Sequence, residues 1–168
     1  MLSVLQPKVG IVSCSGEELA QGTVARLATL KVLHELRPTH TVTICLPLFL
    51  AGGEGDREFA RFHPTITVDG CDLRCAARGT EMYSGKPTAS VVVDDLVAAA
   101  GLAPPEGRRA LNDAGKQAVT LVAGRIARLV DEVLDRRQRA APAAPSPAPG
   151  GGDTDPPSCS CRSRRGPA

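Results

Sequence analysis

The chain has 168 residues, which is room for one domain of ordinary size. Its formal net charge is +2, and the segment from Gln138 onward accounts for all of it, because four arginines there outnumber two aspartates. The preceding part is therefore neutral overall, and the chain contains no Trp, one Tyr and three Phe. Nucleic-acid-binding proteins usually carry basic patches and stacking aromatic side chains, so this composition argues against a nucleic-acid partner.

The composition changes abruptly at Gln138, from a mixture of apolar and charged residues to Pro, Ala, Gly and Ser. We expect a folded domain over residues 1–137 and a disordered tail over residues 138–168, since the tail lacks the large apolar side chains whose burial offsets chain entropy. Near its end the tail contains Cys159 and Cys161. The simpler interpretation is a solvated tail, and the alternative is that these thiols deliver metal to the folded domain.

The sequence shows no pattern of a membrane anchor. The residues before Cys14 are similar to a lipoprotein cleavage site, but Pro7 and Lys8 interrupt the apolar stretch that a signal peptide needs. No run reaches the ~18 apolar residues of a membrane span. We therefore expect a cytoplasmic protein with no membrane partner. In that reducing compartment, spaced cysteines are more often metal ligands or catalytic thiols than disulfides.

The first half of the chain alternates between strand and helix patterns. Residues 8–13 form an apolar run that predicts a strand, and residues 19–33 repeat apolar side chains at helical spacing. Ser15 followed by Glu18 matches a capping box, so we expect Ser15 to cap that helix. Residues 41–46 are rich in β-branched side chains and predict a second strand.

The same alternation continues beyond residue 64. Residues 65–68 predict a third strand, after which Asp69-Gly70-Cys71 is expected to turn directly into a helix. Residues 89–93 predict a fourth strand, and residues 108–137 a long amphipathic helix. Strands alternating with helices favour a parallel sheet that is covered on both faces. We therefore predict an α/β fold, a Rossmann-like three-layer sandwich with a mainly parallel sheet of at least four strands.

Four cysteines lie near the ends of these predicted strands. Cys14 follows the first strand, Cys45 lies near the end of the second and Cys71 lies in the turn after the third. Ligands of open parallel sheets bind outside the carboxyl ends of the strands, so we expect these thiols to meet at one edge. Cys75 lies four residues beyond Cys71, which is one turn of the expected helix. Four thiolates match a tetrahedral zinc site, with an iron–sulfur cluster as the variant.

Other interpretations of these residues remain open. Cysteine is among the most buried residue types, so the four could be inert core thiols, and this is the preferred interpretation for Cys45 alone. A redox dithiol is the next alternative, although Cys71 and Cys75 are separated by three residues rather than by the two of thioredoxin-like motifs. Asp69 is most simply a turn residue or a helix cap, with a role as a base beside the metal ligands as the alternative.

The motifs at these cysteines also carry a family resemblance. Cys14-Ser15-Gly16, Cys45-Leu46-Pro47 and especially Asp69-Gly70-Cys71 with Cys75 resemble the DGC-domain family of zinc-binding proteins, which is named for that tripeptide. The similarity spans residues 8–97. It implies a zinc site formed by Cys14, Cys45, Cys71 and Cys75, and it implies no particular reaction.

These observations lead to one main functional hypothesis and one alternative. The main hypothesis is a zinc-binding protein with a four-cysteine site at the carboxyl edge of a parallel sheet, acting as a metal sensor, carrier or accessory protein. The alternative is an enzyme that uses the same cysteines for redox chemistry, sulfur transfer or a zinc-activated thiolate or water. The expected partner is therefore a metal ion, and the sequence identifies no protein partner.

Overall fold

The computed structural model of the chain describes residues 8–140, which form a four-stranded, entirely parallel sheet. The strands are β1 (Val9–Ser13), β2 (Thr41–Thr43), β3 (Thr65–Asp69) and β4 (Ala89–Val92), and they lie in the order β2-β1-β3-β4. This arrangement confirms the predicted α/β class and the predicted parallel sheet.

The strand register decides which loops meet at the carboxyl edge. Ser13 at the end of β1 pairs with Val68, one residue before the end of β3, so these two strands end together. The third residue of β2, Thr43, pairs with Ile11, so β2 ends two residues short of β1. The second strand is therefore shorter than the predicted 41–46, and the chain leaves the sheet before Cys45.

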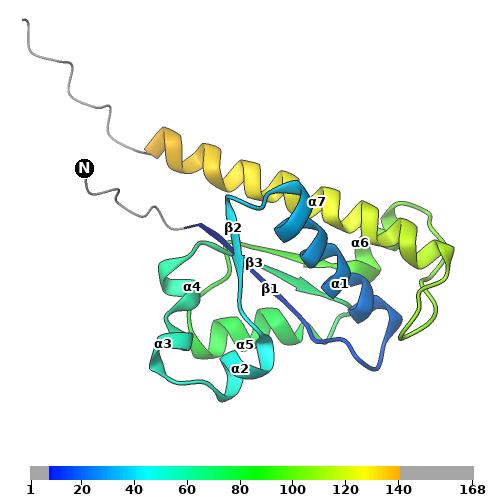
Figure 1. Cartoon of the computed structure of the whole chain (residues 1–168), viewed down its shortest axis with the longest axis horizontal. Helices are drawn as coiled ribbons and strands as arrows, with labels where there is room; N and C mark the ends of the chain where they lie inside the picture. The colour runs from blue at the N-terminus through cyan, green and yellow to red at the C-terminus, as the bar shows by residue number, and fades with distance from the viewer. Residues whose placement is uncertain (1–7, 141–168) are drawn as a thin grey trace, which may run out of the picture.

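One face of the sheet is covered by a group of helices that includes the two longest, α1 (Ala20–Lys31) and α7 (Asp113–Ala140). Helix α1 continues into the π turn η1 (Val32–Leu36), and α6 (Val93–Ala99) completes the group. Figure 1 shows α1 and α7 side by side above the strands. The sequence patterns predicted α1 and α7 but not α6, whose first residue, Val93, was assigned to the fourth strand.

The opposite face carries four helices of four to nine residues. They are α2 (Leu46–Ala51), α3 (Glu54–Arg57), α4 (Phe59–Phe62) and α5 (Cys75–Tyr83). In Figure 1 these four helices lie below the sheet, so the molecule has three layers. The three-layer sandwich is confirmed.

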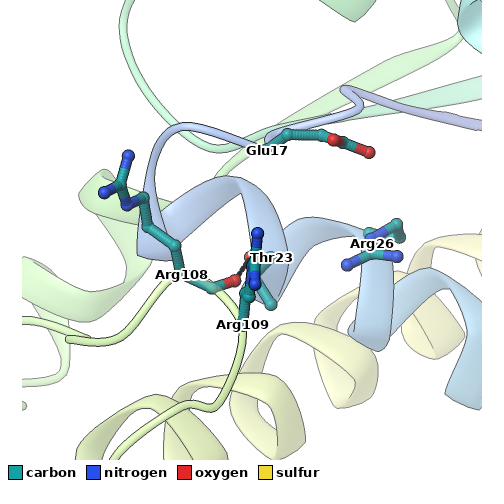
Figure 2. Close-up of a pocket in the computed structure, with 5 residues that line it drawn as sticks. All are labelled: Glu17, Thr23, Arg26, Arg108 and Arg109. Atoms are coloured by element: carbon teal, nitrogen blue, oxygen red, sulfur yellow. Dashed lines mark hydrogen bonds between the residues drawn. The ribbon is translucent and has the colours of Figure 1, made fainter.

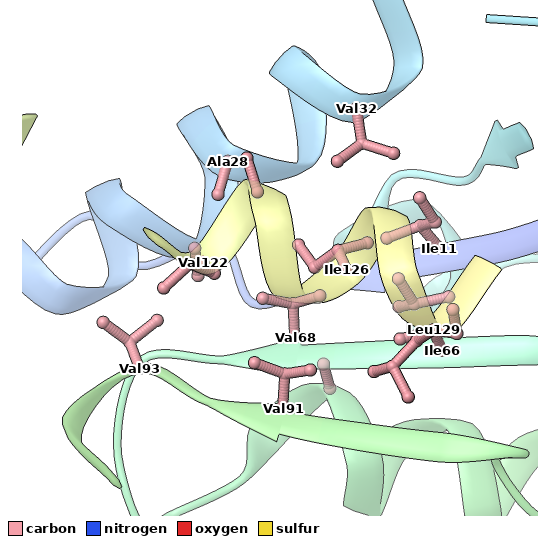
Figure 3. Packing of buried hydrophobic residues seen from close by; sticks show 14 of the residues in the cluster. Ile11, Ala28, Val32, Ile66, Val68, Val91, Val93, Val122, Ile126 and Leu129 are labelled. Carbon is pink, nitrogen blue, oxygen red and sulfur yellow. The ribbon is translucent and has the colours of Figure 1, made fainter. Parts of the chain in front are cut away.

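The larger part of the hydrophobic core lies between the sheet and the helices α1 and α7, and Phe49 of α2 adds to it from the other face. Ile11, Ile66 and Val68 project from the strands toward Val122 and Ile126 of α7, and all five side chains are fully buried (Figure 3). Every residue of β3 is buried, as expected for a central parallel strand covered on both faces. Within residues 8–140, no helix combines the length and apolar character that crossing a bilayer requires.

Two predicted helix starts were wrong. The capping position of α1 is held by Leu19 rather than Ser15, and no side chain caps the helix there. Helix α7 begins at Asp113, five residues later than predicted. There the side-chain oxygen of Asn112 accepts a hydrogen bond from the Gly115 N–H at 2.8 Å, which is the geometry of an N-cap. The residues before Asn112 consequently form a loop.

Candidate functional site

Cys14 lies at the junction of β1 and β3, where both strands end. Its backbone N–H donates to the carbonyl oxygen of Val68 at 2.9 Å, which extends the pairing of the two strands by one residue. Its Sγ accepts a hydrogen bond from the Gly70 N–H at 3.3 Å. With 8% of its surface exposed, Cys14 is the most buried of the four described cysteines.

The environment of Cys14 favours the neutral thiol. Burial raises the pKa of Cys14 to about 11, and the hydrogen bond from Gly70 only partly opposes that effect. Negative charge on Asp69, Cys75 and Cys71 raises the pKa of Cys14 further. A metal cation next to the sulfur would lower the pKa of Cys14, because positive charge stabilises the thiolate, which is the form that binds a metal ion.

Asp69 fixes the start of α5 against the end of β3. Its two carboxylate oxygens accept hydrogen bonds from the N–H groups of Ala76 at 2.7 Å and Ala77 at 3.1 Å. These are the second and third residues of the helix, whose N–H groups have no partner within a helix. Burial raises the pKa of Asp69, whereas the two hydrogen bonds lower it. Asp69 therefore caps a helix, the simpler of its two predicted roles.

Cys71 and Cys75 reach the site through a turn and not through a continuous helix. The Arg74 N–H donates to the Cys71 carbonyl oxygen at 3.2 Å, and Arg74 has a left-handed backbone with φ 51°. Helix α5 begins only at Cys75. The prediction that the two cysteines occupy successive turns of one helix was therefore wrong.

A concave surface of about 400 Å³, here called the cysteine hollow, nevertheless brings three of the four cysteines together. Cys14, Cys71 and Cys75 line it, alongside Asp69 and Arg74. The thiols come from the end of β1, from the turn after β3 and from the first residue of α5. Convergence of Cys14 and Cys71 at one edge was predicted from the strand ends, and the structure confirms it.

Cys45 occupies a different position. It directly precedes α2 and is exposed, so the interpretation of Cys45 as a buried core thiol was wrong. It lines a second concave surface of about 330 Å³, the Cys45 hollow, together with Thr43, Pro47 and Cys14. Because Cys14 lines both hollows, they adjoin at that residue. The early end of β2 accounts for the separation of Cys45 from the other thiols.

Two close approaches among three glycines bring the loops of the cysteine hollow against α1. A Cβ placed on Gly22 of α1 would lie 2.2 Å from the Cα of Gly16, and one placed on Gly70 would lie 2.7 Å from the nitrogen of Gly22. No side chain fits at such distances. The loops after β1 and β3 therefore contact the first turn of α1 directly through backbone atoms.

The donor set fits zinc in its chemistry, since thiolate sulfur is a preferred zinc ligand. Within residues 8–140, however, no group of three or more His, Cys, Asp or Glu side chains is already arranged to hold a metal ion. The three histidines, which the sequence suggested were structural, line neither hollow, and His63 donates through Nδ1 to the Lys8 carbonyl oxygen at 2.9 Å. Cys159 and Cys161 lie outside the described residues.

The sequence patterns did not identify a further cavity that lies next to these two hollows. It is lined by Glu17, Thr23, Arg26, Arg108 and Arg109. Arg108 and Arg109 were assigned to the long helix, and only the N-cap of α7 at Asn112 could have indicated that they belong to a loop. Glu17 also lines the cysteine hollow, so the two sites are neighbours.

Comparison with known proteins supports the family resemblance. No curated protein and no solved structure matches the chain. Among protein families, the DGC domain matches residues 10–104, a segment that includes all four described cysteines and excludes α7. Since this match covers more than half of the 168 residues, the chain belongs to the DGC-domain family.

Proposed function

We propose that this protein binds zinc through Cys14, Cys71 and Cys75, with Cys45 as the fourth ligand. The observation that carries the proposal is the cysteine hollow, where three thiols from separate segments line one surface at the carboxyl edge of the sheet. In a domain with four described cysteines, such convergence is more than the burial tendency of cysteine explains, because Cys75 is exposed and Cys71 only half-buried.

Cys45 is the ligand that would complete the set. It is exposed and directly precedes the six-residue helix α2, so few contacts oppose a change in its side-chain direction. Its hollow adjoins the cysteine hollow at Cys14. A bound zinc ion would act as a cross-link between the loops that follow β1, β2 and β3.

Residues of the chain compensate part of the negative charge that four zinc-bound thiolates would carry. Four thiolates and one divalent zinc carry a formal charge of −2. Arg74 lines the cysteine hollow and supplies one positive charge there, whereas buried Asp69 adds a negative one. The hydrogen bond from Gly70 to the Cys14 sulfur would also favour thiolate, as N–H donors do around metal-bound sulfur.

Metal analysis of the full chain, purified without chelator, tests this proposal. We expect about one zinc per chain and a melting temperature that falls when a chelator removes the metal, because ligation in the native state contributes to stability. Cys71→Ser and Cys75→Ser should each lower the zinc content. Cys159→Ser and Cys161→Ser are the matched controls and should retain zinc. Unchanged zinc content and melting temperature in Cys71→Ser and Cys75→Ser would show that the ligand assignment is wrong.

The exposed position of Cys45, in its own hollow, favours an enzyme as the second candidate function. A closed site with four protein ligands is typical of structural zinc, whereas catalytic zinc keeps a position for water or substrate. X-ray absorption at the zinc edge distinguishes the two, since four sulfur neighbours indicate a closed site and three sulfurs with one oxygen an open one. Visible absorbance of anaerobically purified protein would instead indicate an iron–sulfur cluster.

A further inference from the structure

The cavity beside the cysteine hollow, here called the cationic cavity, gathers three arginines from two distant parts of the chain. Arg26 belongs to α1, whereas Arg108 and Arg109 belong to the loop before α7. Glu17 and Thr23 complete its lining, and its volume is about 610 Å³ (Figure 2). A volume of this order lies within the range of small-molecule sites.

The loop that carries Arg108 and Arg109 is attached to α1 by a buried hydrogen bond. The hydroxyl of Thr23 donates to the carbonyl oxygen of Arg108 at 2.7 Å, across 85 positions of sequence, and Thr23 is only 2% exposed (Figure 2). This bond fixes the backbone at Arg108 against the helix that supplies Arg26. The fold therefore fixes the backbone that carries Arg108 next to the helix that carries Arg26.

The ends of the same loop are closed by Asn112. Its backbone N–H donates to the Glu106 carbonyl oxygen at 3.0 Å, and its side-chain oxygen accepts from the Glu106 N–H at 3.2 Å. Between them, Gly107 has φ +86°, and a Cβ at that position would lie 2.0 Å from the Ala110 carbonyl oxygen. The turn that presents the two arginines thus requires glycine and is closed by two hydrogen bonds.

The guanidinium groups of the cationic cavity have no partners within residues 8–140. The five ion pairs of this region involve other basic residues, and no side-chain hydrogen bond from Arg26, Arg108 or Arg109 is formed. Glu17 lines the same cavity without pairing to any of them. The three arginines line one cavity and form no ion pair there, so the N–H donors of their guanidinium groups are available to a ligand.

We propose that the cationic cavity binds a phosphate-class dianion, either inorganic phosphate or the phosphate group of a small molecule. Three guanidinium groups and one carboxylate give the cavity a formal charge of +2, which matches the nearly doubly negative charge of a phosphate monoester at neutral pH. Guanidinium forks match the oxygen spacing of phosphate and form strong charge-assisted hydrogen bonds with it. A single carboxylate would engage one fork and leave two arginines unpaired.

This site goes beyond the proposed zinc function and does not depend on it. Its arginines do not line the cysteine hollow, although Glu17 lines both and Arg26 also lines the Cys45 hollow. A phosphorylated small molecule held by Arg108 and Arg109 would lie next to the thiols. Arg108 and Arg109 also lie beyond the residues that match the DGC domain, so this part of the cavity comes from the segment that follows the family match.

Calorimetric titration of the full chain, purified without chelator, tests the proposal. The ligands are inorganic phosphate and glycerol phosphate, each at constant ionic strength, because exposed charge interactions weaken with salt. We expect saturable binding that weakens by at least about tenfold in the double variant Arg108→Gln/Arg109→Gln, given the strength of charge-assisted hydrogen bonds. Arg128→Gln is the matched control, since Arg128 is an exposed arginine of α7 outside the cavity, and it should bind as the unaltered chain does.

A second variant gives an effect of the opposite sign. Glu17→Gln removes the one negative charge of the cavity and should tighten phosphate binding. Saturation by glycerol phosphate as well as inorganic phosphate would identify a phosphorylated small molecule, and saturation by inorganic phosphate alone would identify the free ion. The proposal is overturned if neither ligand saturates the protein or if Arg128→Gln weakens binding as much as the double variant. It is also overturned if the double variant weakens only the binding of a polyanion such as heparin.

Discussion

Each residue of the tripeptide Asp69-Gly70-Cys71 has a distinct physical task in this structure. Asp69 caps α5 with both carboxylate oxygens, and the Gly70 N–H donates to the sulfur of Cys14. Gly70 also lies against the backbone of Gly22, where no side chain would fit. Cys71 lines the cysteine hollow. Three consecutive residues therefore position a helix, a neighbouring thiol and a thiol of their own.

The contact between Gly22 and Gly16 leads to a prediction about stability. Gly22→Ala should lower the free energy of unfolding by about 1–3 kcal/mol, because its Cβ would lie 2.2 Å from the Cα of Gly16 and backbone atoms must shift. Urea denaturation measures this change. Access to the thiols of the cysteine hollow should change too, and the rate of alkylation of Cys71 and Cys75 would report it.

Gly124→Ala provides the matched control, since Gly124 also lies within a helix. Its added Cβ would meet only the end of the flexible Arg128 side chain at 3.8 Å. Alanine is the better helix former, so this variant should gain about 0.5–1 kcal/mol. Equal effects of the two substitutions would contradict the close approach of α1 to the loop after β1.

At the scale of elements, one ion pair ties the end of the first helix to α7. Arg37 follows η1, and its Nε and Nη2 donate to the two oxygens of Asp131 at 2.7 and 2.6 Å. Hydrogen bonding to Arg37 holds the pKa of Asp131 below its ordinary value. Because the folded state lowers this pKa, the pair stabilises the protein above the unfolded pKa of Asp and loses that effect as the pH falls through the folded pKa.

Asp131→Asn should therefore destabilise the protein in a pH-dependent way. At neutral pH we expect a loss of at most about 1 kcal/mol, since both side chains are more than one third exposed to water. The difference from the unaltered chain should shrink between about pH 5 and pH 2, as Asp131 becomes protonated. Urea denaturation across this pH range measures it.

Asp135→Asn is the control for that measurement. Asp135 lies one turn further along α7, is exposed and forms no ion pair within the described residues. Its substitution removes the same charge without breaking a link between elements, so it should leave the free energy of unfolding nearly unchanged. A pH-dependent loss as large in Asp135→Asn as in Asp131→Asn would mean that net charge, and not the ion pair, is responsible.

In the whole molecule, the segment that matches the family is shorter than the segment that packs into one core. The match ends at residue 104, yet α7 follows it and contributes Val122, Ile126 and Val130 to the core, each fully buried. Removing α7 would expose the apolar side chains of α1 and the sheet that pack against it. Residues 10–104 are therefore expected to be insufficient for a stable fold.

Two shortened chains test where the folding unit ends. A chain that ends at Ala140 should keep the melting temperature of the full chain, because the residues it loses are mainly Pro, Ala, Gly and Ser. A chain that ends at Pro104 should show no cooperative melting, since it lacks the buried face of α7. If that chain melted cooperatively, the assignment of α7 to the core would be wrong.

The chain that ends at Ala140 also tests the alternative role of the tail. It lacks Cys159 and Cys161, so a zinc loading rate equal to that of the full chain would exclude a metal-delivery role for these two cysteines. Slower loading with unchanged final zinc content would support that role, because delivery affects the rate and not the equilibrium.

Local patterns along the chain were enough to predict the class of fold and the edge of the sheet at which the thiols gather. Apolar runs alternate with helical patterns over most of the chain, and in a parallel sheet all carboxyl ends lie on one side. Cys14 directly follows β1 and Cys71 lies two residues after β3, so their convergence depended only on that rule and on short-range pattern.

The position of Cys45 and the set of arginines that line the cationic cavity depend on tertiary packing. The end of β2 at Thr43 depends on its pairing with β1, a contact across 32 positions that local pattern does not encode. The cationic cavity needs Thr23 of α1 to hold the carbonyl oxygen of Arg108 across 85 positions. Contacts of this kind arise only when distant segments pack together, so neither feature is visible in the spacing of residues along the chain.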